Sequence, residues 1–224
     1  MPDSVRQLPL DLPVRAARGR TAFLVAGPNA RAVAEIDRWR DWPGGKLALA
    51  GPAGAGKSHL AAIWAAETGA RRLAGDALPE AAGLAGASVL VDEADAVPGC
   101  ATSEARLLHL HNHVLGGGGR LLLVGRTPPA RWAVALPDLA SRLRATHVAT
   151  IAAPDDVLLT AVMGKLFEDR GVTVAPDVLS YCVARMERSF AEAERVVAAL
   201  DARALAAGRR IGKRLAAEVL AEAG

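Results

Sequence analysis

The sequence predicts an α/β fold, in which a five-stranded parallel sheet with helices on both faces is followed by a small all-helical domain. Between residues 46 and 150, short apolar segments alternate with helical stretches, which is the pattern of a parallel sheet covered by helices. Near-continuous apolar runs such as Val89–Val91 and Leu121–Val124 are typical of strands buried on both faces. From Pro154 onward the strand pattern ends, and the remaining segments are helical in character.

Strands, helices and domain boundaries are expected at definite positions. The expected strands are residues 46–50, 71–73, 88–92, 120–125 and 146–151. The expected C-terminal helices are residues 155–169, 176–187, 189–207 and 212–222, separated by glycine and proline. The chain is therefore expected to comprise an N-terminal tail (1–20), an α/β domain (21–153) and a helical domain (154–224).

Composition excludes several classes of protein. The net charge of +3 comes without a basic block large enough to predict nucleic-acid binding. No apolar run approaches membrane-spanning length, and the N-terminus lacks the apolar segment of a signal peptide. Cys100 and Cys182 have neither the spacing of a disulfide framework nor that of a zinc site. These features predict a cytoplasmic protein that does not bind membranes.

A glycine-rich loop follows the first expected strand. Gly51, Gly56, Lys57 and Ser58 match the phosphate-binding pattern G-x-x-x-x-G-K-[ST], between an apolar strand and an alanine-rich helix. Glycines let backbone amides fold around phosphate oxygens, while the lysine contacts the β- and γ-phosphates and the serine binds Mg²⁺. The motif predicts a site for ADP or ATP with Mg²⁺. Its nucleotide-binding residues are Gly51, Pro52, Ala53, Gly54, Ala55, Gly56, Lys57, Ser58 and His59.

An acidic pair ends the third expected strand. In "SVLVDEADAV", Asp92 stands at the carboxyl end of a strand that neighbours the loop, where a carboxylate can hold Mg²⁺ together with Ser58. Glu93 is the candidate base that deprotonates an attacking water. A second polar cluster, "HLHNH", places His109 and His113 on one helix face and His111 on another, which argues against a metal site.

A helical domain placed after the sheet resembles the arrangement of AAA+ ATPases. Small-molecule P-loop kinases, in contrast, usually continue as one α/β domain with an inserted lid. In "LPDLASRLRA", Arg142 stands where AAA+ proteins carry an arginine finger directed at a neighbour's nucleotide. In "MERSFAEAERVV", Arg188 matches the sensor-2 position, which contacts bound phosphate. The resemblance therefore implies catalysis in trans by Arg142 and cofactor binding by Arg188, with a solvated helix face as the alternative for each.

From about residue 20 to its end, the chain resembles the AAA+ domain of the DnaA family of replication initiators. The segments that carry the resemblance are "FLVAGPNARAVAEI", "GKSHL", "LLHLHNHV", "TPP" and "LASRL". DnaA continues with a DNA-binding helix-turn-helix domain, for which this chain leaves no room, so we expect no direct sequence-specific DNA binding. The interval before Asp92 is also too short for the extra helix with which DnaA-type initiators contact single-stranded DNA. The pattern is that of a DnaA-homologous regulator.

The tail contains a candidate partner-binding peptide, "QLPLDLP". Regulators of this kind begin with a peptide of the form Gln-Leu-x-Leu-x-Leu that binds the DNA polymerase sliding clamp (its β subunit). Gln7, Leu8, Leu10 and Leu12 match that form. A proline-stiffened extended peptide loses less entropy on docking, and its leucines can fill an apolar groove.

One departure from the DnaA pattern concerns sensor 1. Gly125 and Arg126 stand where DnaA has a polar Ser-Asp pair, and Thr127 is the candidate substitute. Whether the chain hydrolyses ATP itself, and whether it self-associates, stay open.

The expected function is a nucleotide-bound AAA+ regulator, tethered to the clamp, that promotes hydrolysis of DnaA-bound ATP and limits initiation to once per cycle. The alternatives are a DnaA-like loader that contacts single-stranded DNA and a small-molecule P-loop kinase.

Overall fold

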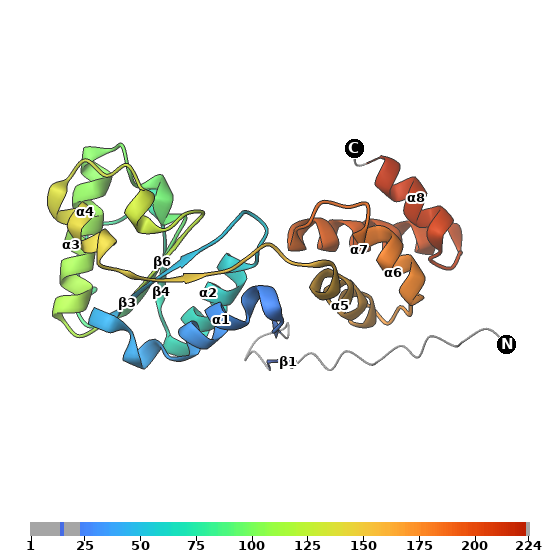
Figure 1. The fold of residues 1–224 in the computed structure, drawn as a ribbon, viewed down its shortest axis with the longest axis horizontal. Helices are drawn as coiled ribbons and strands as arrows, with labels where there is room; N and C mark the ends of the chain where they lie inside the picture. Colours follow the sequence, from blue (N-terminus) through green and yellow to red (C-terminus); the bar gives the residue numbers. More distant parts are fainter. Residues whose placement is uncertain (1–13, 16–22, 223–224) are drawn as a thin grey trace.

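The computed structural model describes residues 14–15 and 23–222. A five-stranded parallel sheet forms the centre of the α/β domain (Figure 1). Its order is β4-β5-β6-β3-β7, so β3 lies between β6 and β7. The strands are β3 (Lys46–Ala50), β4 (Arg71–Ala74), β5 (Ser88–Asp92), β6 (Arg120–Gly125) and β7 (His147–Thr150). The predicted parallel sheet is confirmed, and because all five strands run in one direction, their carboxyl ends meet at one edge.

Helices cover both faces of this sheet. They are α1 (Gly27–Asp37), α2 (Lys57–Thr68), α3 (Ala101–Gly116) and α4 (Pro137–Arg144). Side chains alternate along each strand, so β6 sends Leu122 and Val124 into the core that contains α1 and α2 residues. Leu121 and Leu123 instead pack with residues of α3 and α4. The near-continuous apolar strands of the sequence are thus explained by burial on both faces.

Short elements connect these layers. Single 3₁₀ turns occur at η1 (Trp39–Asp41), η2 (Pro43–Gly45), η3 (Gly75–Ala77), η4 (Ala94–Ala96) and η5 (Pro129–Arg131). Ahead of α1, β1 (Val14–Arg15) pairs antiparallel with β2 (Phe23–Leu24). Two residues within the range expected for the tail are therefore paired with the start of the α/β domain.

The helical domain follows β7 and lies to one side of the sheet (Figure 1). It consists of α5 (Asp156–Glu168), α6 (Pro176–Val183), α7 (Phe190–Ala207) and α8 (Lys213–Ala221). These helices share a separate hydrophobic core, which includes Met163, Phe167 and Leu200. The side chains of Asp155 and Ser189 cap the N-termini of α5 and α7 by accepting N–H bonds from Leu158 and Glu192. The expected domain boundary falls in the segment between β7 and α5.

Across the described residues, every helix is too short or too polar to cross a lipid bilayer.

Candidate nucleotide-binding site

The loop between β3 and α2 depends on glycine for its shape. Gly54 and Gly56 have φ angles of +70° and +87°, in the left-handed region that side chains rarely adopt. Gly51 lies against the carbonyl group of Ile151, with which any Cβ atom would overlap. The loop ends where α2 begins, at Lys57, so the unpaired N–H groups of the first helical turn lie at the loop. Such a loop forms an anion-binding cradle.

The polar side chains expected at a phosphate and magnesium site lie together. The hydroxyl of Ser58 donates a hydrogen bond to Oδ1 of Asp92 at 3.2 Å, which joins the start of α2 to the end of β5. A hydroxyl beside a carboxylate is the oxygen donor set that Mg²⁺ prefers. The amine of Lys57 donates to the carbonyl of Pro52 at 2.7 Å, within the same loop. These residues therefore fit the group that the motif predicts.

Glu93 has an unusual backbone conformation. Its φ of +49° makes it the sole non-glycine residue with a positive φ in the part of the chain that the structure describes. Its N–H donates to Oδ1 of Asp92 at 3.1 Å, and Gly75 packs so closely against its carbonyl that a Cβ there would overlap. Left-handed backbone at a non-glycine residue costs free energy and is typical of functional sites.

A cavity of about 510 Å³ opens at this edge of the sheet. Of the predicted site residues it is lined by Ala53, Gly54, Lys57, Ser58, Asp92 and Glu93. It is also lined by Asp95, Ala96, Val124, Gly125 and Arg126. Asp95 was not among the predicted site residues, although its position three residues after Asp92 was a signal. Arg126 had appeared only as a departure from the sensor-1 pattern, and Thr127 is absent from the described lining.

Charged groups around the cavity act on one another. Burial lowers the pKa of Lys57, and Arg126 adds to this effect. The carboxylates of Asp95 and Asp92 oppose it. The cavity thus holds two cationic and three anionic side chains, including Glu93.

The helical domain touches the P-loop at the start of α7. The N–H of Phe190 donates to the carbonyl of Gly54 at 3.1 Å, and a Cβ on Gly54 would overlap Ser189. Arg188 precedes this contact, but its guanidinium pairs with Asp156 at 3.0 Å, and Arg188 does not line the described cavity. The predicted phosphate contact by Arg188 stays a prediction.

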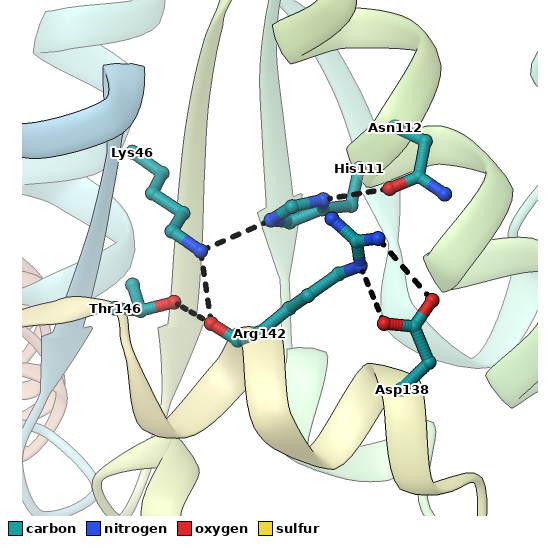
Figure 2. A network of polar contacts seen from close by, with 6 residues as sticks. All are labelled: Lys46, His111, Asn112, Asp138, Arg142 and Thr146. Atoms are coloured by element: carbon teal, nitrogen blue, oxygen red, sulfur yellow. Dashed lines mark hydrogen bonds and ion pairs between the residues drawn. The ribbon is translucent and has the colours of Figure 1, made fainter.

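Arg142 lies at the other end of β3. The amine of Lys46, the first residue of β3, donates to the main-chain carbonyl of Arg142 at 2.9 Å (Figure 2). Thr146 Oγ1 donates to the same carbonyl at 3.0 Å, and the guanidinium pairs with Asp138 at 3.0 Å. The five residues of β3 separate its two ends by about 13 Å. Arg142 is therefore remote from the cavity of its own chain.

His111 completes this polar network. Its Nε2 lies 3.1 Å from the Lys46 amine, and its Nδ1 lies 3.2 Å from Oδ1 of Asn112 (Figure 2). An ammonium can only donate, so Nε2 accepts and Nδ1 carries the proton. Burial and the charge of Lys46 lower the pKa of His111 to about 4.

His111 is buried, whereas His109 and His113 are exposed on another face of α3. Among the described residues, no group of three or more His, Cys, Asp or Glu side chains could hold a metal ion.

The predicted clamp-binding residues Gln7, Leu8, Leu10 and Leu12 lie outside the described residues.

Comparisons with known proteins place the fold. No family model matches the chain. Domain III of the Thermotoga maritima replication initiation protein DnaA superposes with a TM-score of 0.75 at 16% identity, over 89% of this chain and 94% of that chain. The fold is that of an AAA+ protein.

Two further solved structures share this fold. AMPPCP-bound DnaA from Aquifex aeolicus has a TM-score of 0.66 at 15% identity, covering 80% of this chain and 63% of that chain. The RuvB Holliday junction branch migration motor of Thermotoga maritima has a TM-score of 0.63 at 16% identity, covering 85% and 68%. At these identities the matches establish the AAA+ fold alone.

A sequence match points to DnaA in particular. The chromosomal replication initiator protein DnaA of Sphingopyxis alaskensis is 33% identical over 135 residues. The match covers 60% of this chain, and the chain spans 30% of the length of that relative. The chain is therefore similar to DnaA in sequence over this match, as well as in fold.

Proposed function

We propose that this AAA+ chain is a nucleotide-bound regulator of replication initiation of the Hda type. Tethered to the DNA polymerase sliding clamp, it promotes hydrolysis of ATP bound to DnaA. The hydrolysis leaves DnaA with ADP and inactive, so that an origin fires once per cycle. The single observation that carries this proposal is the position of Arg142, in a chain that is 33% identical to a DnaA over 135 residues.

Arg142 is suited to act on a neighbouring molecule. Its carbonyl accepts a hydrogen bond from Lys46 at the end of β3 opposite the P-loop, and Arg142 is not among the described residues that line the cavity of its own chain. The ion pair with Asp138 joins side chains that are 39% and 54% exposed. An exposed pair of this kind contributes less than about 1 kcal/mol, so docking of a partner can release the guanidinium. A guanidinium near a γ-phosphoryl group stabilises the charge that develops there and accelerates transfer by about 10³–10⁵.

The chain's own cavity is proposed to hold ADP or ATP. The glycines of the P-loop would bind phosphate oxygens, Lys57 would leave the Pro52 carbonyl to contact the β- and γ-phosphates, and Ser58 and Asp92 would hold Mg²⁺. When bound, Mg²⁺ would neutralise part of the phosphate charge. The carboxylate of Glu93 would accept the proton of an attacking water if the chain hydrolyses ATP itself. The contact between Gly54 and Phe190 links the bound phosphates to the position of the helical domain.

The N-terminal peptide is proposed to bind the clamp through Gln7, Leu8, Leu10 and Leu12. Support comes from the pairing of Val14–Arg15 with Phe23–Leu24, which attaches the chain to the α/β domain two residues after Leu12. A peptide attached so close to the domain would hold the AAA+ surface near the clamp and raise its effective concentration there. A cytoplasmic location follows from these partners.

The test is hydrolysis of ATP pre-bound to DnaA, measured with and without this protein and with clamp loaded on DNA. We expect stimulation that requires all three components. Arg142→Ala should bind clamp and DnaA but fail to stimulate, whereas the matched control Arg144→Ala, on the same helix, should stimulate as the unaltered protein does. Gln7→Ala combined with Leu10→Ala should lose clamp binding and retain nucleotide binding.

Two results would contradict the proposal. Stimulation that survives Arg142→Ala would remove the finger assignment. No stimulation with either ADP or ATP supplied would leave a P-loop protein of another role. In that case salt-sensitive binding to single-stranded DNA would favour a loader, and turnover with a small acceptor would favour a kinase.

A further inference from the structure

The end of β6 differs from what a polar sensor residue requires. Gly125 is the last residue of β6, and a Cβ atom there would lie 2.9 Å from Cζ2 of Trp132 and 3.3 Å from Cγ of Asp95. Such distances leave no space for a serine or asparagine side chain. The polar group at this point of the cavity is instead the carboxylate of Asp95, which comes from the neighbouring segment after β5.

Trp132 and Asp95 together fix the residues that follow β6. The indole Nε1 of Trp132 donates to the carbonyl of Thr127 at 3.0 Å, which closes the loop on itself. The N–H of Arg126 donates to Oδ2 of Asp95 at 2.7 Å, a charge-assisted bond. Asp95 is thereby bonded to the backbone of Arg126, and the Arg126 side chain is the next one that reaches the cavity.

Sheet register places Arg126 beside the P-loop. Ala50 of β3 pairs with Gly125 of β6, so the next residues along the two strands, Gly51 and Arg126, leave the same edge of the sheet side by side. Arg126 and the P-loop residue Lys57 both line the cavity. Arg126 is exposed, and within the described ranges no residue forms a hydrogen bond or an ion pair with its guanidinium. The cavity is therefore lined by a guanidinium group that has no hydrogen-bond or ion-pair partner among the described residues.

We propose that Arg126 is a phosphate-binding residue, acting within its own chain, that makes the site prefer a nucleoside triphosphate to a diphosphate, with Asp95 as its positioning residue. The proposal rests on the proposed nucleotide binding and deepens it. A guanidinium presents paired N–H donors that match phosphate oxygens, and it keeps its charge at all physiological pH values. In place of the polar Ser-Asp pair of the DnaA pattern, the site uses a full positive charge, on a residue whose backbone N–H is bonded to the carboxylate of Asp95.

The test compares the dissociation constants of the full-length protein for ADP and for a non-hydrolysable ATP analogue, both with Mg²⁺. Arg126→Ala should weaken binding of the ATP analogue by about tenfold to a hundredfold, because a charge-assisted hydrogen bond to the additional phosphate is lost. Binding of ADP should change by less than about threefold. Arg131→Ala is the matched control, since Arg131 is exposed on the same loop and outside the described lining; it should change neither constant.

Substitutions of Asp95 separate positioning from structure. Asp95→Asn keeps an oxygen that can accept the Arg126 N–H, so it should preserve the ratio of the dissociation constant for ADP to that for the ATP analogue. Asp95→Ala should lower this ratio toward the value of the Arg126→Ala variant. In an Arg126→Ala background, Asp95→Ala should have no further effect on the ratio. Thermal melting identifies any variant that fails to fold.

The outcomes distinguish this proposal from the one on which it rests. Unaltered protein that binds neither nucleotide would overturn both. Unaltered protein that binds nucleotides, together with an Arg126→Ala variant that loses affinity for both equally or for neither, would overturn the role of Arg126 and leave nucleotide binding standing.

Discussion

The amine of Lys46 donates a hydrogen bond to the main-chain carbonyl of Arg142 at 2.9 Å, across 96 residues of sequence (Figure 2). Lys46 begins β3, and the last residue of β3, Ala50, is followed directly by the P-loop. One central strand therefore connects the candidate nucleotide site at its carboxyl end to Arg142 at its amino end. Any shift of β3 along its axis would move both the candidate nucleotide site and Arg142.

The Lys46–His111 pair should stabilise the fold as a unit. Lys46→Met removes the donor to His111 Nε2, and His111→Leu removes an acceptor from the buried amine; each should lower the free energy of unfolding by about 1–3 kcal/mol. Because the double variant leaves neither group unpaired, its loss should be smaller than the sum by at least about 0.5 kcal/mol. Urea titration measures these values.

A second pair of substitutions, in which the lysine is not in contact with His111, serves as the control for this coupling. Lys165 carries an exposed ion pair with Asp169 in the helical domain, so Lys165→Met and His111→Leu should be additive. Additivity of Lys46→Met with His111→Leu would show that the buried pair is not coupled.

Stability should depend on the protonation of His111. Its pKa is lowered from 6.5 to about 4 in the folded protein, where Lys46, Arg142 and Asp138 are the charged groups around it. Between these values the unfolded chain binds a proton that the folded chain does not, so the free energy of unfolding falls as the pH falls. The expected loss between pH 7 and pH 5 is about 2 kcal/mol.

His111→Leu should abolish this part of the pH dependence. The lowered pKa of Glu104 acts in a different range, below its ordinary value of 4.5, and so does not contribute between pH 7 and pH 5. An unchanged pH profile in His111→Leu would assign the dependence to another group.

The substitution Gly54→Ala should disrupt the contact between the P-loop and the helical domain. A methyl group at Gly54 would overlap Ser189, so the start of α7 must move and the bond from Phe190 N–H to the Gly54 carbonyl must lengthen. We expect weaker nucleotide binding, by about tenfold, from the loss of one or two loop contacts. Faster proteolysis between β7 and α5 should accompany it.

Gly83→Ala is the control that separates the effect of backbone strain from the effect of overlap with a neighbouring residue. Gly83 has a φ of +78°, close to that of Gly54, but a Cβ there would meet nothing within 4 Å. Its substitution should cost stability and leave nucleotide affinity and proteolysis unchanged. Equal effects of the two substitutions would mean that strain alone accounts for Gly54.

Glu104 should be essential for the position of α4. This residue is 1% exposed, and its carboxylate accepts N–H bonds from Gly99, Ala135 and Leu136. Burial raises its pKa, but the three N–H donors more than compensate, so the pKa lies below its ordinary value. Glu104→Gln supplies one acceptor oxygen and an unwanted donor, and it should lower the free energy of unfolding by about 2–4 kcal/mol. Glu194→Gln, at an exposed position of α7, should change it by less than about 0.5 kcal/mol.

Local features of the sequence were sufficient for the sheet and the loop. The strands at 46–50, 88–92 and 120–125 have the predicted bounds, because short apolar runs bounded by turn residues suit strands that are buried on both faces. The P-loop was recognisable because Gly54 and Gly56 need left-handed φ angles and the motif spacing is short. His111 was correctly placed away from His109 and His113 by helical periodicity alone.

Tertiary structure decided which distant residues meet. The bonds from Lys46 to His111 and to Arg142, and from Arg126 to Asp95, join residues 65, 96 and 31 positions apart. No periodic pattern encodes such pairs, because they depend on strand order, on the close packing of Trp132 against the position where a Cβ of residue 125 would lie, and on which buried polar groups find partners. By itself the sequence determined the α/β fold and the phosphate loop, since both follow from local sterics and burial. Only the tertiary structure revealed that Arg142 lies away from its own cavity and that Arg126 lies within it, because the order of strands around β3 sets both positions.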